Sequence, residues 1–79
     1  MEVTDAIERV LAEDRAALHW TVIQDRALRD GYIDPFEVRD VRKQVLAALA
    51  AMVRTGRVRK VSTGTYELAE PREREGDSS

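Results

Sequence analysis

Arg39, Arg42 and Lys43 are the side chains whose types and spacing most clearly indicate chemistry in this sequence. They recur at i, i+3 and i+4, which places them on one face if this segment is helical. Arginine forms bidentate hydrogen bonds with guanine edges, and the adjacent Gln44 can read adenine in the same way. A helix that begins with these residues could therefore read bases in the major groove of double-stranded DNA.

A second group of basic residues follows later in the chain. Arg57, Arg59 and Lys60 lie in a short segment that is typical of a strand. From a strand beside the groove these side chains could contact phosphates, with Thr63 and Thr65 as neutral hydrogen-bond donors. The alternative interpretation is that the basic residues of both groups only solvate a surface and pair with the acidic N-terminal half of the chain.

The distribution of charge along the chain favours a polyanion as the partner of these bases. The net charge is −2, yet residues 1–38 hold nine acids and four bases, residues 39–66 hold seven bases and one acid, and residues 67–79 hold five acids and two bases. A basic element therefore lies within an acidic protein. Because counterion release drives sequence-independent DNA binding, we expect a single chain of this charge to bind DNA weakly and with marked salt dependence.

Other kinds of chemistry have little support in the sequence. The chain has no Cys and a single His, His19, which we interpret as structural, so we expect no metal site and no redox pair. No nucleophile–base pair or phosphate-binding glycine loop is recognisable, so we expect no enzymatic activity, no cofactor and no small-molecule substrate. No apolar run is long enough to cross a bilayer, and we expect a cytoplasmic protein without a membrane partner.

Apolar residues at helical spacing predict a first helix near the N-terminus. Thr4 is one candidate for its N-cap, and the alternative is a capping box formed by Asp5 and Glu8. The helix is predicted to end near Asp14. Residues 17–19 follow as a short extended link or as one strand of a small sheet. The apolar face of the helix comprises Ala6, Ile7, Val10 and Leu11.

A second helix is predicted to begin at Trp20 or Thr21 and to stop at Asp30. Gly31 then fits the left-handed position that commonly follows a helix. We interpret Trp20, and likewise Tyr66 near the end of the chain, as core residues rather than as rings that stack on bases. The apolar face of this helix comprises Trp20, Ile23, Ala27 and Leu28.

The clearest local signal for a third helix is the segment Asp34-Pro35-Phe36-Glu37. Aspartate is a preferred N-cap, proline is favoured at the first helical position, and glutamate at the third position completes a capping box. A second start is possible at Asp40, so the helix either runs continuously from Pro35 or restarts after one turn. Its predicted end is Thr55, with Gly56 as the left-handed residue. Its apolar face comprises Val41, Val45, Leu49, Met52 and Val53.

After this helix the period of the sequence changes from helical to extended. Residues 57–61 and 65–68 are predicted to form two strands joined by a turn at residues 62–64. Val58 and Val61 are three residues apart, so apolar and polar residues do not alternate strictly along the first strand. We therefore expect a bulge or a short first strand.

The order of these elements predicts an α+β, mainly α fold. It is that of a winged helix-turn-helix domain, with three helices and a C-terminal β-hairpin as the wing. We expect the domain to span residues 1–68. Residues 69–79 have no large apolar side chain, and we expect them to form a disordered acidic tail.

Several short motifs resemble the HARE-HTH branch of winged helices, over about residues 6–68. They are Leu18-His19-Trp20 and Ile23 on the second helix, Val45, Leu49 and Met52 on the third, Thr55-Gly56-Arg57-Val58, and the closing Gly64-Thr65-Tyr66-Glu67-Leu68. This branch appears beside restriction enzymes, chromatin factors and a bacterial RNA polymerase subunit. The resemblance therefore implies an association with nucleic acid or with the transcription machinery.

The sequence thus favours a small bacterial DNA-binding protein, a transcription regulator or an accessory factor, that binds duplex DNA through its third helix and wing. The alternative is a protein–protein interaction module of a larger complex, in the transcription machinery or a restriction system, with little DNA binding of its own. In that case the apolar stretch Ala47–Ala51 could contact a protein partner or a second copy of the chain.

Overall fold

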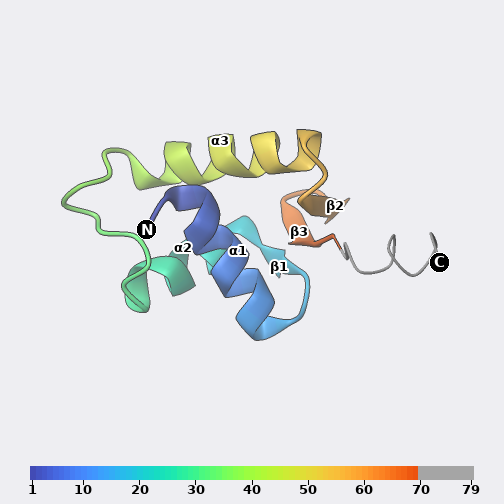
Figure 1. Ribbon diagram of the computed structural model, residues 1–79, viewed down its shortest axis with the longest axis horizontal. Helices are drawn as coiled ribbons and strands as arrows, with labels where there is room; N and C mark the ends of the chain where they lie inside the picture. The colour runs from blue at the N-terminus through green and yellow to red at the C-terminus, as the bar shows by residue number, and fades with distance from the viewer. Residues whose placement is uncertain (70–79) are drawn as a thin grey trace.

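Three helices and three short strands follow one another along residues 1–69, the part of the chain that the structure, a computed structural model, describes (Figure 1). They are α1 (Val3–Asp14), β1 (Leu18–His19), α2 (Trp20–Arg29), α3 (Val41–Arg54), β2 (Val58–Ser62) and β3 (Thr65–Leu68). This mainly helical α+β layout is winged-helix-like and confirms the predicted fold class. Apart from Ala69, the predicted acidic tail lies outside the described residues.

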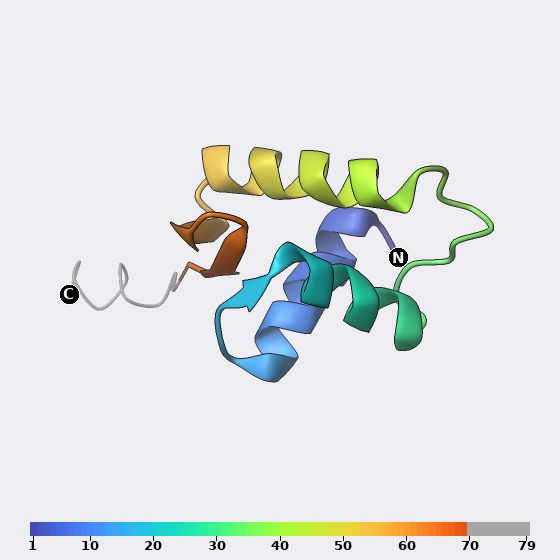
Figure 2. The same ribbon diagram turned by 180° about the vertical axis from the view of Figure 1, so that it is seen from behind.

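The sheet places the C-terminal hairpin next to the start of α2. Its strand order is β1-β3-β2, and both pairings are antiparallel, with Leu18 opposite Tyr66 and Val58 opposite Leu68. A register shift between Lys60 and Ser62 confirms the expected bulge. Seen from behind, β1 leads directly into α2, while the hairpin lies beside the C-terminal end of α3 (Figure 2). We call the β2–β3 hairpin the wing.

The core forms where the apolar faces of all three helices meet. α1 packs against both α2 and α3, and the loop residue Ile33 and the strand residue Val58 complete the buried cluster. The predicted apolar faces are confirmed except at Val53, which is 38% exposed. Val53 follows the buried Met52 by one residue, so it lies about 100° further around the helix and points away from the core. The buried residues are Ala6, Ile7, Val10, Leu11, Ile23, Ala27, Ile33, Val45, Leu49, Met52 and Val58.

The start of α1 differs from the prediction. The helix begins at Val3 with Glu2 as its N-cap, and no side chain caps it. Thr4 and Asp5 therefore lie within the first turn, and the predicted N-cap and capping box are wrong. Val3 packs against the core, so its burial favours an earlier start than the polar residues indicate.

The start of α3 resolves the two alternatives in favour of Asp40. Its side chain accepts a hydrogen bond from the backbone N–H of Lys43 at 3.4 Å. Asp34 instead closes a turn within the loop, where its carboxylate accepts from the N–H of Phe36 at 2.9 Å and its carbonyl from that of Val38 at 3.0 Å. The two segments cannot join as one helix because Asp40 has a left-handed backbone, with φ +52°.

The remaining helix boundaries agree with the sequence. α2 ends at Arg29 and α3 at Arg54, and the glycines that follow, Gly31 and Gly56, have φ values of +78° and +82°. His19 has the structural role expected of it, since its side chain caps α2 by accepting from the backbone N–H of Thr21 at 3.3 Å.

Candidate nucleic-acid interface

The first turn of α3 brings together most of the basic residues predicted to read DNA. Arg42, Lys43 and Gln44 are all exposed there, and Arg39 is exposed in the loop immediately before the Asp40 N-cap. α3 as a whole contains three basic residues and no acidic residue. The helix therefore presents a positively charged start that no side chain of its own neutralises.

The outward face of α3 has a basic residue at each end and alanines between them. Lys43, Ala47, Ala50 and Arg54 are exposed and lie opposite the buried face, with spacings close to whole turns of helix. Because the two alanines end at a methyl group, a partner can approach the helix backbone closely there.

Arg42 is positioned by a neighbouring ring. Its guanidinium carbon lies 5.7 Å from the centroid of the Trp20 ring, within the range of a cation–π interaction. Trp20 itself is half-buried and packs against the core, as predicted. Arg42 is thus held on the side of α3 that faces the start of α2.

The basic residues of the wing are less available than the sequence indicates. Arg57 forms an ion pair with Glu8 of α1 at 2.5 Å, and this carboxylate raises the pKa of the guanidinium. Arg59 pairs with Glu67 on the neighbouring strand at 2.9 Å. For Arg57 the alternative interpretation, pairing with the acidic N-terminal half, describes the structure, whereas Arg59 pairs with an acid of the wing itself. Lys60 remains exposed on β2.

The threonines predicted to donate hydrogen bonds differ in their surroundings. Thr63 is exposed in the turn of the wing, whereas Thr65 is half-buried at the start of β3. Of the two, Thr63 is the better placed to meet a phosphate. Of the wing residues predicted to contact DNA, Lys60 and Thr63 are thus exposed and take part in no ion pair within residues 1–69.

Some acids of residues 1–38 are paired with groups of the same part of the chain. Glu13 accepts hydrogen bonds from the Tyr32 hydroxyl at 2.6 Å and from Arg9 at 2.9 Å, and these donors lower the pKa of its carboxyl. Arg26 lies between Asp14, at 3.2 Å, and Asp30, at 3.8 Å. Within residues 1–69 no ion pair reaches Arg39, Arg42, Lys43 or Lys60.

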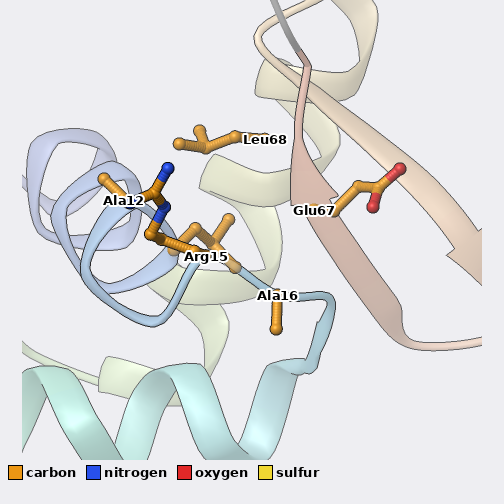
Figure 3. Close-up of a pocket in the computed structure, with 6 residues that line it drawn as sticks. Ala12, Arg15, Ala16, Glu67 and Leu68 are labelled. Atoms are coloured by element: carbon orange, nitrogen blue, oxygen red, sulfur yellow. The ribbon is translucent and has the colours of Figure 1, made fainter.

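Two surface hollows were not anticipated from the sequence. One, of about 400 Å³, lies between the end of α1 and β3, and Figure 3 shows Arg15 and Glu67 among the side chains at its edges. The other, of about 470 Å³, lies at the start of α3, with Leu46 and Ala47 as its apolar part and with Arg42 and Lys43 beside them. The first joins residues that are distant in the sequence, whereas the second is lined only by residues 40–47.

Residues 1–69 lack a side-chain cluster for a metal ion and a helix that could span a membrane. These residues contain no group of three or more His, Cys, Asp or Glu side chains that could hold a metal ion. None of their helices is both long enough and apolar enough to cross a membrane. Comparison with models of protein families, with curated proteins and with solved structures gave no match.

Proposed function

We propose that this protein binds double-stranded DNA through the first turns of α3. The observation that carries the proposal is the exposed cluster of Arg39, Arg42 and Lys43, whose side chains form no ion pair within residues 1–69. In helix-turn-helix proteins the N-terminal residues of the recognition helix contact base edges in the major groove. The arginines have the bidentate geometry that recognises guanine, and Gln44 has the amide that recognises adenine.

The rest of the outward face fits the same role. The methyl groups of Ala47 and Ala50 would allow α3 to lie deep in the groove and to contact thymine methyl groups. Lys60 and Thr63 would contact phosphates beside the groove. Arg57 and Arg59 would contribute only if the ion pairs with Glu8 and Glu67 opened, so we assign them a smaller part than the helix.

The net charge of the chain sets the expected strength of binding. The affinity gained from counterion release at a few phosphates is opposed by the repulsion between DNA and a chain of net charge −2. Binding should therefore be weak, and the affinity should fall steeply with salt. We therefore propose a cytoplasmic transcription regulator or accessory factor, related to the HARE-HTH branch of winged helices, that acts next to other DNA-binding surfaces rather than alone.

A fluorescence anisotropy titration with a labelled random-sequence duplex tests this proposal. The wild type should bind at about 50 mM salt and lose most of its affinity by about 200 mM. Arg42→Ala/Lys43→Ala should weaken binding about tenfold or more at the lower salt. It should reduce the slope of log K against log salt by up to about 1.8, the value reached when both side chains contact phosphates of the random-sequence duplex.

A matched variant tests whether DNA binding depends on the exposed face of α3 or only on the net charge of the protein. Arg9→Ala/Arg15→Asn also removes two positive charges, one from α1 and one from the residue that follows it. Asparagine tolerates the left-handed backbone of Arg15, with φ +55°. This variant should bind as the wild type does, apart from a small uniform loss. Equal losses in both double variants, or no binding of the wild type at the lower salt, would overturn the proposal.

A further inference from the structure

Phe36 is the most unusual apolar residue on the surface of this protein. Its exposed fraction is 97%, and it lies in the loop between α2 and α3, which extends away from the helices (Figure 1). A phenylalanine side chain buries about 150–250 Å² when it is covered, so full exposure forgoes a large favourable contribution. Single exposed apolar residues are common on protein surfaces, so the charges and the turn around Phe36, and not its exposure alone, bear on a partner.

The backbone around Phe36 is ordered rather than loose. The carboxylate of Asp34 accepts from the N–H of Phe36 at 2.9 Å, and the carbonyl of Asp34 accepts from the N–H groups of Glu37 and Val38, each at 3.0 Å. Pro35 further restricts the turn. The ring is therefore presented in one backbone conformation, and binding it would cost little additional chain entropy.

The charges beside Phe36 indicate what kind of surface would cover it. Asp34 and Glu37 are both exposed and flank the ring in the turn. Two carboxylates disfavour a nucleic acid, because phosphates would repel them. They favour an apolar hollow whose edges carry basic side chains.

The chain itself offers such a hollow at the start of α3. Leu46 and Ala47 supply the apolar part, Arg42 and Lys43 supply the basic side chains, and Asp40 completes the lining. The hollow is shallow and open, with a volume of about 470 Å³, so it can contact one face of an aromatic ring rather than enclose it. Since Phe36 is almost fully exposed, it does not fill the hollow of its own chain.

We propose that a second copy of this chain binds here, with Phe36 of each copy in the Leu46–Ala47 hollow of the other. The ring and the hollow are separate parts of one surface, so a two-fold axis can exchange them and form both contacts at once. Glu37 of one copy would then lie near Lys43 of the other. The buried area is small, so we expect a weak, reversible dimer.

This inference is independent of the proposed function, since assembly is measured without DNA. The dimer would cover Arg42 and Lys43, however, and would therefore compete with a duplex for the start of α3. Self-association would then inhibit DNA binding more strongly as the protein concentration rises.

Sedimentation velocity of the full chain over a wide range of concentration tests the dimer. The wild type should change from monomer to dimer as concentration rises. Phe36→Ser should raise the dissociation constant about tenfold or more, as expected when a central aromatic contact is lost. Val22→Ser, which changes a valine that is 41% exposed on α2, should leave the dissociation constant unchanged.

A charge exchange tests the predicted partners. Glu37→Lys and Lys43→Glu should each weaken the dimer, and Glu37→Lys/Lys43→Glu should recover most of the loss because the two charges meet again across the axis. A wild type that stays monomeric throughout, equal effects of Phe36→Ser and Val22→Ser, or no recovery in the exchanged variant would overturn the proposal. Far-ultraviolet circular dichroism checks that each variant is folded.

Discussion

Arg42 lies over the ring of Trp20, with 5.7 Å between its guanidinium carbon and the centroid of the indole. The backbone N–H of Trp20 also donates to the carbonyl of Gly64 in the turn of the wing, at 2.9 Å. One residue therefore contacts the start of α3, begins α2 and joins the wing. The position of Arg42 at the candidate interface depends on this arrangement.

Trp20 gives an intrinsic signal for binding, because it is the one tryptophan of the chain. If a duplex draws Arg42 from the ring to a phosphate or a base, the emission of Trp20 should change in parallel with the anisotropy of labelled DNA. Arg42→Ala should change the emission of the free protein and abolish most of the further change on titration. Binding without any change in Trp20 emission would show that Arg42 stays on the ring.

The ion pair between Arg57 and Glu8 should restrain the wing. Glu8→Gln removes the carboxylate that holds the guanidinium, so Arg57 becomes available to a phosphate. We expect tighter duplex binding and a slope of log K against log salt that is steeper by up to about 0.9. Asp25→Asn is the matched control, since it removes one acidic charge from an exposed position on α2. Equal gains in the two variants would argue that only net charge matters.

Two glycines with similar backbones should respond differently to alanine. Gly31 has φ +78° and no atom within 4 Å of an added Cβ, so Gly31→Ala should cost about 1–2 kcal/mol of stability from backbone strain alone. At Gly64, with φ +76°, the Cβ would lie 2.7 Å from Nε2 of His19. Chemical denaturation should therefore show a larger loss for Gly64→Ala.

A double variant tests the origin of that difference. His19→Ala removes the ring that the added Cβ would meet, so Gly64→Ala/His19→Ala should lose less stability than the sum of the two single changes. If the losses were additive, the close approach of residue 64 to the ring would not be the cause.

The hydrogen bonds to Glu13 should make stability depend on pH at the acidic end. The Tyr32 hydroxyl and the Arg9 guanidinium lower the pKa of this carboxyl in the folded state. The two hydrogen bonds therefore stabilise the folded state fully above the pKa of this carboxyl in the unfolded chain, about 4.3. This stabilisation is lost as the pH falls through the lower pKa of the folded state. Thermal unfolding of Glu13→Gln should be less sensitive to acid than that of the wild type. Tyr32→Phe should show an intermediate sensitivity, and an unchanged profile in Glu13→Gln would contradict this account.

Local signals predicted the ends of the helices and the wing well. Gly31 and Gly56 marked where helices stop because their left-handed backbones are costly for other residues. The unequal spacing of Val58 and Val61 indicated the bulge before any pairing was known. The start of α3 was harder to predict, since Asp34 had the stronger local signal, with Pro35 and Glu37 after it, and yet Asp40 is the N-cap. The left-handed backbone of Asp40 separates the turn from α3.

The availability of individual bases could not be read from the sequence. Arg57 and Glu8 are 49 positions apart, and they meet only because α1 packs beside the wing. The contact between Arg42 and Trp20 likewise joins two helices. Charge counts therefore located the basic segment correctly but overstated the number of its side chains that are open to a partner.

Amide chemical-shift mapping with a random-sequence duplex at about 50 mM salt tests the central claim most directly, because phosphate contacts are strong under that condition. The account predicts the largest perturbations at residues 39–47, smaller ones at Lys60 and Thr63, and none on the outer face of α1. Perturbations centred on α1, or a spectrum that does not change over the titration, would contradict the claim that the start of α3 binds DNA.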